Sequence, residues 1–462
     1  MTDGTGAAKA VEAAVETAVE TAADAAGNWA RAGRNAGLAG AAIGVVAAGA
    51  AAGVAIERLT VGRGMRRKAR LALDASGPFG TLRGTPGTAI AEDGTALYYE
   101  VDEPGETAQG PEEGGPGGAA GKGGSGNAAT AVKADKSARA GRGGKNVRPV
   151  QDGQGGAQGG FRKRLLSALG RRSAAPTVVF CHGYCLSQDS WHFQRAALRG
   201  TVRTVHWDQR SHGRSARGHG QMDGTEPVTI DLLGRDLKAV LDTAVPQGPI
   251  VLVGHSMGGM TVMALADQFP GFVAERVVGV ALVGTSAGRL SEVAFGLPSL
   301  GVKAFHRFAP GVLKAMGAQS EIVERGRRAT ADLFAGLVKR YSFGTPKDVD
   351  PAVARFAERL IEATPIDVVA EFFPAFAVHD KTEALVAYDA LPALVLAGDR
   401  DLITPADHSQ TIGELLPAAE LVCVEGAGHL VMLERPELVN DHLVTLVERA
   451  SAGSRSSRSA RA

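Results

Sequence analysis

The sequence has few cysteines: Cys181, Cys185 and Cys423 are the only three in 462 residues. An odd number cannot all pair, and disulfide frameworks are typical of secreted proteins, so we expect a reducing compartment. Charge of one sign is also lacking, since the formal net charge is +1. The overall charge therefore gives no argument for nucleic acid binding. Histidines, cysteines and carboxylates do not cluster with metal-ligand spacing, and we expect neither a metal nor an organic cofactor.

Large apolar side chains are scarce between residues 104 and 172, where glycine, alanine and lysine are frequent. Such a segment cannot bury enough surface to offset the entropy lost on ordering, so we predict a disordered insertion over 104–172. The Ser/Arg-rich tail, 451–462, is also predicted to be disordered. One α/β domain needs about 250–300 residues. The two segments therefore account for part of the length by which this chain exceeds one such domain.

Charged residues are missing from one long stretch near the N-terminus, Gly37 to Ile56. This length can span a bilayer, and more basic residues follow it than precede it. We therefore predict an Ala-rich helix or tail over 1–36, a transmembrane helix over 37–57 and a basic juxtamembrane linker over 58–86. The positive-inside rule places the rest of the chain in the cytoplasm, anchored to the cell (inner) membrane by a single pass. A soluble Ala-rich helix is the alternative, because the stretch is mostly alanine and glycine.

A G-x-S-x-G pattern with Ser256 at its centre follows the apolar run Pro249–Val253 and precedes the helix-compatible segment Gly259–Phe269. Strand, sharp turn and helix are the context in which this pattern forms a nucleophile elbow. The small residues Gly254 and Gly258 meet the steric need of such a turn. A serine there lies at a helix N-terminus, where free N–H groups favour developing negative charge. An isolated match could also be an ordinary turn, so partner residues must decide.

Acidic residues follow a second predicted strand, Leu394–Gly398, which is short, apolar and ends in glycine. An acid just past a strand end is where the third member of a catalytic triad is expected. Asp399 and Asp401 both meet this condition. The other reading of either residue is an acid that caps a turn.

A histidine follows the next strand-like run, Leu421–Val424, and precedes the helix-like segment Pro436–Ala450. His429 is therefore the predicted general base, although a lone histidine after glycine is more often a turn residue. Serine, acid and histidine follow one another along the chain in the order expected for a triad on an α/β sheet. This order differs from the orders found in other serine hydrolases.

An early strand, Thr177–Phe180, runs into a His182-Gly183 pair. Such a loop can turn a backbone N–H toward the nucleophile, and we predict Tyr184 N–H and Met257 N–H as the donors of an oxyanion hole. One such donor is typically worth about 10²–10³ in rate. An ordinary tight turn is the alternative for the His-Gly pair.

The segment Asp208-Gln209-Arg210-Ser211-His212-Gly213-Arg214-Ser215 comes after the strand-like Val202–Trp207. With it, the sequence resembles the α/β-hydrolase superfamily, in which a D-x-R-G-x-G-x-S loop follows the fourth strand. Ser211 replaces the first glycine of that pattern, which puts the exact turn in doubt. In the family's G-x-x-D pattern the acid stands three positions after the glycine, and the resemblance therefore favours Asp401 over Asp399.

The resemblance extends from about Gly87 to Ala450 and implies an α/β-hydrolase domain over 87–103 and 173–450. Its sheet would have eight mostly parallel strands flanked by helices. The Asp93-Gly94 pair independently predicts a hairpin over 88–101, which matches the antiparallel opening of that sheet.

The distance between the strand Val277–Val283 and Leu394 exceeds what a plain connection needs, so we predict a helical cap over about 286–382. Seven phenylalanines are available to line an apolar cleft there: Phe295, Phe305, Phe308, Phe334, Phe372, Phe373 and Phe376.

These observations together predict a serine hydrolase that cleaves carboxylic esters of apolar substrates, like an esterase or lipase. The serine at the elbow argues against dehalogenase and epoxide hydrolase relatives, which use an aspartate there. Cofactor-free haloperoxidase (perhydrolase), thioesterase, C–C bond hydrolase and acyltransferase activities remain open, because they also use serine. A non-catalytic membrane scaffold is the alternative from another class. The sequence leaves the oligomeric state unknown.

Overall fold

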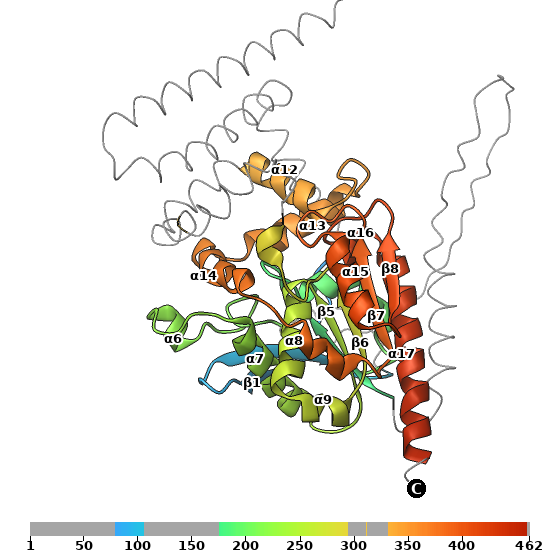
Figure 1. Ribbon diagram of the computed structural model, residues 1–462. Coiled ribbons are helices and arrows are strands. Elements are labelled where there is room, and N and C mark those ends of the chain that lie inside the picture. The colour runs from blue at the N-terminus through green and yellow to red at the C-terminus, as the bar shows by residue number, and fades with distance from the viewer. Residues whose placement is uncertain (1–78, 106–174, 294–310, 312–330, 460–462) are drawn as a thin grey trace, which may run out of the picture.

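A computed structural model describes residues 79–105, 175–293, 311 and 331–459 (Figure 1). In this part the chain forms one sheet of eight strands in the order β1-β2-β4-β3-β5-β6-β7-β8. The hairpin β1–β2 is antiparallel, β2 pairs antiparallel with β4, and the remaining neighbours are parallel. The strands are β1 (Thr85–Ile90), β2 (Ala96–Asp102), β3 (Thr177–Cys181), β4 (Thr204–Trp207), β5 (Ile250–His255), β6 (Val277–Val283), β7 (Ala393–Gly398) and β8 (Glu420–Val424).

Helices cover both faces of this sheet (Figure 1). The α-helices described are α5 (His192–Leu198), α6 (His219–Met222), α7 (Ile230–Ala244), α8 (Met257–Gln268), α9 (Pro270–Arg276), α12 (Ala331–Ser342), α13 (Pro351–Glu362), α14 (Ile366–Ala377), α15 (Ala406–Leu415), α16 (Val431–Glu434) and α17 (Pro436–Ser459). Short 3₁₀ helices are η1 (Gln188–Trp191), η2 (Leu290–Glu292) and η3 (Glu383–Tyr388). The predicted fold, a mostly parallel sheet flanked by helices, is confirmed.

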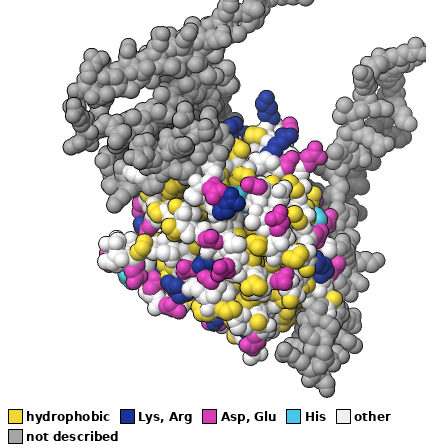
Figure 2. All heavy atoms as spheres, viewed as in Figure 1, with side chains coloured by type: hydrophobic (Ala, Val, Ile, Leu, Met, Phe, Trp, Pro, Cys, Tyr) yellow, Lys and Arg dark blue, Asp and Glu magenta, His cyan; other side chains and the backbone are white. Residues whose placement is uncertain are grey.

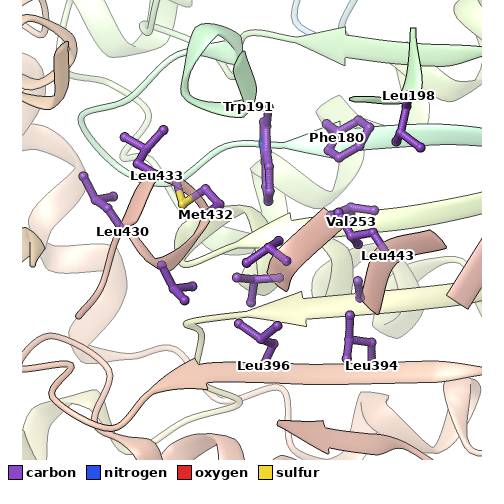
Figure 3. Close-up of a cluster of buried hydrophobic side chains, with 14 of the residues drawn as sticks. Phe180, Trp191, Leu198, Val253, Leu394, Leu396, Leu430, Met432, Leu433 and Leu443 are labelled. Carbon is purple, nitrogen blue, oxygen red and sulfur yellow. The ribbon is translucent and has the colours of Figure 1, made fainter. Parts of the chain in front are cut away.

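Alternation along the central strands divides the core into two clusters. In β6, Ala281 and Val283 face one cluster, whereas Val280 and Leu282 face the other. The first cluster lies under α17, and Figure 3 shows Phe180, Leu394, Leu396 and Leu443 among its side chains. The second lies under α7 and α8. Because both faces of these strands are buried, their sequences are continuous apolar runs.

The segment predicted as a cap contains η2 and the helices α12, α13 and α14 in its described part. Phe295, Phe305 and Phe308 lie outside the described residues, and of Phe334 only its place in α12 is described. Phe372 is buried, with 1% of its surface exposed, while Phe373 and Phe376 are half-buried. Phe356 and Leu360 of α13 pack into the first core cluster, so this part of the cap shares the core of the sheet.

Two predicted boundaries are wrong. The folded domain begins before Gly87, because β1 starts at Thr85 and the ring of Phe79 packs edge-on against Phe193. At the other end, α17 continues through Ser451 to Ser459, into the tail predicted to be disordered. No proline interrupts the helix after its first residue, and the Ser451 hydroxyl donates to the Val447 carbonyl (2.7 Å).

The other predicted segments, 1–36, the transmembrane helix over 37–57, most of the linker over 58–86 and most of the insertion over 104–172, lie outside the described residues. Among the helices that the structure does describe, none is long and apolar enough to cross a bilayer. On the described surface of the face in Figure 2, basic and acidic side chains are interspersed.

Candidate active site

Ser256 lies between the end of β5 and the start of α8, at a sharp turn. Its backbone has φ 52° and ψ −121°, a positive φ that an L-residue rarely adopts. Such a conformation costs about 1–3 kcal/mol and persists only where the surroundings enforce it. Here the Ser256 N–H donates to the Val283 carbonyl (3.0 Å), and its own carbonyl accepts from the Thr285 hydroxyl (2.7 Å).

The glycines of the pattern are required by close backbone approach. A Cβ on Gly254 would lie 2.5 Å from the Gly258 carbonyl oxygen. A Cβ on Gly258 would lie 2.2 Å from the Cys181 carbonyl oxygen, and one on Gly259 would lie 2.5 Å from Thr285 Oγ1. The turn therefore excludes larger residues at these positions, as the sequence pattern predicts.

The structure brings the predicted serine, histidine and acid together in one chain of hydrogen bonds. His429 Nε2 lies 3.0 Å from Ser256 Oγ, and His429 Nδ1 lies 2.8 Å from Asp401 Oδ2. Each residue is almost enclosed, with exposed fractions of 7% for Ser256, 6% for His429 and 4% for Asp401. Since a carboxylate only accepts, Nδ1 carries the proton and Nε2 is left to accept from the serine hydroxyl.

The Asp401 carboxylate is fully hydrogen-bonded. Its Oδ1 accepts from Ile403 N (2.8 Å) and Thr404 N (3.0 Å), and its Oδ2 accepts from the Thr404 hydroxyl (2.9 Å) as well as from His429. Burial alone would raise the pKa of Asp401, but His429 and these N–H groups hold it below the ordinary value. Asp401 is thus an ionised acceptor that fixes the imidazole.

Asp399 has the alternative role, that of an acid that caps a turn. Its Oδ1 accepts from Gly426 N (2.7 Å) and so holds the turn that leads to the histidine. Thr404 was not singled out from the sequence, although it stands only three positions after Asp401.

His255, the variable residue of the elbow pattern, also was not predicted to contribute. Its Nε2–H donates to the His429 carbonyl (2.9 Å), which ties the elbow strand to the histidine loop. Burial, together with the neighbouring His429, lowers the pKa of His255 to about 3, so the ring is neutral near neutral pH.

The loop after β3 packs directly against the elbow. A Cβ on Gly183 would lie 3.1 Å from Ser256 Cβ, so the glycine allows this approach. His182 fixes the loop, because its Nδ1–H donates to the Gly183 carbonyl (2.8 Å) and its Nε2 accepts from Gln209 N (2.9 Å). Burial lowers the pKa of His182 to about 4, and both roles require the neutral ring.

The two predicted oxyanion donors are the N–H groups of Met257, the residue after the serine, and Tyr184, the residue after Gly183. Met257 is the first residue of α8, where a backbone N–H has no partner within the helix. Tyr184 follows Gly183, and its neighbour Cys185 has φ 59°, with its N–H donating to His212 Nε2 (3.2 Å). The hydrogen bond to His212 therefore holds the backbone of the loop after β3 in this conformation.

An apolar group from the cap adjoins these donors. Val368 and Phe372 of α14 pack in one buried cluster with Met257 and Met260, and Tyr184 packs against it. The Tyr184 hydroxyl donates to the Val369 carbonyl. Apolar and aromatic cap side chains therefore share a buried cluster with Met257, the residue that follows Ser256.

The loop after β4 keeps its turn despite the serine at the position of the family's first glycine. Ser211 adopts φ 63°, the conformation for which glycine is favoured. The second glycine is needed for space, since a Cβ on Gly213 would lie 2.3 Å from the Asp208 carboxyl carbon. That carboxylate accepts from Gln188 N (2.7 Å) and Arg214 N (3.0 Å).

No disulfide bond joins the three cysteines, of which Cys181 is buried, Cys185 half-buried and Cys423 exposed. Within the ranges that the structure describes, no group of three or more histidine, cysteine or carboxylate side chains is placed to hold a metal ion.

Comparison with known proteins identifies the family. The family model described as "Alpha/beta hydrolase family" matches residues 178–442. The chain is similar to a dihydrolipoyllysine-residue acetyltransferase component of an acetoin cleaving system from Pseudomonas putida, with 28% identity over 61% of this chain, and it spans 65% of that relative. It is also similar to 3-oxoadipate enol-lactonase 1 from Acinetobacter baylyi, with 26% identity over 57% of this chain and 85% of the relative.

A third relative is a bifunctional esterase/perhydrolase from Acinetobacter calcoaceticus, with 27% identity over 59% of this chain and 92% of the relative. The matched region contains every residue of the hydrogen-bond chain at the elbow. The chain belongs to the alpha/beta hydrolase family and is an enzyme of the hydrolase class.

Proposed function

We propose that the protein hydrolyses carboxylic esters through a covalent acyl-enzyme on Ser256. The observation that carries this proposal is the unbroken chain from Ser256 Oγ through His429 to Asp401, with distances of 3.0 and 2.8 Å. Similarity to a lactonase and to an esterase/perhydrolase supports ester cleavage as the reaction. The apolar cap residues that share a buried cluster with Met257, next to the serine, support an apolar acyl or alcohol group.

In the proposed acylation step, Ser256 Oγ attacks the ester carbonyl carbon while His429 Nε2 accepts the hydroxyl proton. Asp401 holds the Nδ1–H tautomer and stabilises the imidazolium that forms. The negative charge develops on the carbonyl oxygen, and the N–H groups of Tyr184 and Met257 are the proposed donors to it.

Collapse of the tetrahedral intermediate breaks the bond to the alcohol oxygen. His429 returns its proton to that oxygen, and the alcohol leaves. A water molecule then attacks the acyl carbon, with His429 again accepting the proton. The carboxylic acid is released and the Ser256 hydroxyl is restored.

The test is a chain-length series of p-nitrophenyl esters, run on wild-type protein and on Ser256→Ala. We expect hydrolysis by the wild type with a maximum at one acyl length, and a loss of roughly 10⁶-fold in kcat for the variant. A folded Ser256→Ala protein with wild-type kcat would refute the proposal.

Perhydrolysis is the second candidate, supported by the similarity to the bifunctional esterase/perhydrolase. It differs only in the nucleophile that attacks the acyl-enzyme, with hydrogen peroxide in place of water and a peracid as product. Adding peroxide to the ester assay and measuring peracid separates the two. Acyl transfer to an added alcohol or thiol would give a new ester or thioester in place of the free carboxylic acid. The same assay therefore detects it as a lower yield of free acid.

For the location of the enzyme, we propose that residues 37–57 anchor it to the membrane with the hydrolase domain in the cytoplasm. The uncharged stretch and the basic residues that follow it support this. A reporter fused after Ala462 should be active in the cytoplasm. Full-length protein recovered in the soluble fraction would contradict the membrane anchor. A reporter that is active outside the cytoplasm would contradict the orientation.

A further inference from the structure

The loop that carries His429 is bonded to other parts of the chain immediately before and after the histidine. Gly428 N donates to Glu434 Oε2 (2.8 Å), and Leu430 N donates to the Ser342 carbonyl at the end of α12 (2.8 Å). The position of the imidazole therefore depends on Glu434 and on the end of a cap helix.

The Glu434 carboxylate faces four donors although only 1% of its side chain is exposed. Its Oε2 accepts from Gly428 N (2.8 Å) and Gly344 N (3.1 Å), and its Oε1 accepts from Thr345 N (3.3 Å). The Thr345 hydroxyl lies 3.3 Å from both Glu434 Oε1 and the Gly426 carbonyl oxygen, and its one proton can go to either. Every one of these partners is a donor. The site therefore fits a carboxylate, because an amide at this position would turn its NH₂ toward at least one donor.

The cap segment Ser342–Thr345 also touches the histidine loop backbone to backbone. A Cβ on Gly428 would lie 2.5 Å from Gly344 N, and a Cβ on Gly344 would lie 2.5 Å from the Ala427 carbonyl carbon. No side chain fits between the two segments, so a shift of one must be transmitted to the other.

We propose that Glu434 is a positioning residue that joins the cap segment Ser342–Thr345 and the His429 loop into one unit. In this unit His429 Nε2 stays within reach of Ser256 Oγ only while the end of α12 is held against the loop. The inference rests on the proposed function of the serine and adds that the cap controls the alignment of the base as well as covering the site.

The alternative is that Glu434 only stabilises the fold. A purely structural role would lower the melting temperature but leave kcat per folded molecule unchanged. A positioning role lowers kcat and the rate of labelling by a fluorophosphonate, since both need His429 to activate the serine, and leaves KM nearly unchanged. A misplacement of about 1 Å can cost roughly 10²-fold in rate.

The experiment compares full-length Glu434→Ala and Glu434→Gln with Glu437→Gln, which removes a carboxylate from an exposed residue at the start of α17. We expect kcat and the labelling rate to fall together by roughly 10- to 100-fold in Glu434→Ala. Glu434→Gln should lose less, because its carbonyl can still accept from Gly428 N. Glu437→Gln should behave like the wild type.

The downfield Nδ1 proton of His429, observed by NMR, gives a readout that does not depend on turnover. Its resonance should shift or broaden in Glu434→Gln and stay unchanged in Glu437→Gln. Folded Glu434 variants with wild-type kcat, labelling rate and resonance would overturn this inference while leaving the proposed function intact. A wild-type protein that is not labelled at Ser256 would overturn both. If Glu434→Ala does not fold, the nearly isosteric Glu434→Gln decides.

Discussion

Two groups of hydrogen-bonded charged and polar side chains are built differently, one at the nucleophile elbow and the other centred on Arg210. In the first, hydrogen bonds run from Asp401 through His429 and end at the Ser256 hydroxyl. In the second, the Arg210 guanidinium donates twice to Asp236 (2.5 and 2.6 Å). The first group is a chain that ends at a reactive atom, whereas the second, the arginine group, is centred on a guanidinium.

The arginine group also includes Asp93 and Gln221, which both accept from Arg210 Nη1 (2.8 and 3.3 Å). Burial opposes the charge on Arg210, but the carboxylates of Asp236 and Asp93 raise its pKa above the ordinary value. A guanidinium cannot give up its proton in such a site, so this group can hold segments together but cannot transfer a proton. An aspartate beside an imidazole can support catalysis, and an aspartate beside a guanidinium supports the fold. Four predictions sharpen this difference.

The largest effect is expected on activity, from Asp401→Asn. An asparagine amide can donate to Nδ1 and so favour the wrong tautomer of His429, and kcat should fall by about 10⁴-fold while the protein stays folded. The control is Asp399→Asn, which alters only the turn at Gly426 and should keep most of the activity. Steady-state ester hydrolysis measures both. Equal losses in the two variants would contradict the assignment of Asp401.

The next effect is on stability, from Arg210→Met. Removing the guanidinium leaves Asp236 buried without its partner, which should lower the free energy of unfolding by about 3–5 kcal/mol. The control Arg235→Met breaks a pair with Glu92, whose side chains are 36% and 73% exposed, and a hydrogen bond to Gln268 Oε1 (3.0 Å) at the surface. This should change stability by less than about 1 kcal/mol.

Urea unfolding of both arginine variants gives the comparison, and ester hydrolysis at low urea tests whether activity follows. Arg210→Met should retain the kcat of the wild type in the molecules that stay folded. A loss of kcat without a loss of stability would show that the arginine group takes part in catalysis.

A smaller effect concerns pH. Burial alone would raise the pKa of Asp93, but hydrogen bonds from Arg210 and Thr95 lower it from 3.8 to about 2. A lowered pKa means that Asp93 stabilises the fold above pH 3.8 and that this contribution is lost as the pH falls through about 2. Since Asp93 is partly exposed, solvent screening should keep it under about 1 kcal/mol.

The check for Asp93 is the stability of Asp93→Asn and wild type measured from about pH 5 downward. The two curves should converge as the acid is protonated. A difference that grows at low pH would contradict the prediction.

The smallest effect is expected at Ser211, next to Arg210. Its φ of 63° favours glycine, so Ser211→Gly should relieve strain and stabilise the protein by roughly 0.5–1 kcal/mol. The loss of the hydrogen bond from Gln221 Nε2 to the serine hydroxyl (3.2 Å) works against this gain. A thermal melt measures the balance, and a lower melting temperature would mean that the hydrogen bond outweighs the strain.

The sequence predicts the parts of the site that depend on local pattern. Ser256, Asp401 and His429 each follow an apolar run, and parallel strands bring their carboxyl ends to the same edge of a sheet. The order of the three residues then distinguishes them from chance matches. The glycines could be predicted for the same reason, because a tight turn excludes side chains whatever the rest of the fold.

The residues that the sequence did not reveal act through contacts between distant segments. Glu434 meets Gly344 across 90 residues, and His255 meets His429 across 174 residues. No spacing rule encodes such contacts. Thr404 is different, since a hydroxyl three residues after an acid is a local signal that could have been used. The exact ends of the domain depend on packing, as the contact of Phe79 with Phe193 shows.

The central claim is that Ser256 is the nucleophile and that His429 and Asp401 activate it. The most direct measurement is intact-mass and peptide-mass analysis of the protein after reaction with a fluorophosphonate. The account predicts one adduct per chain, located on Ser256, formed quickly in the wild type and much more slowly in Asp401→Asn. Folded wild-type protein that forms no adduct, or an adduct on another residue, would contradict it.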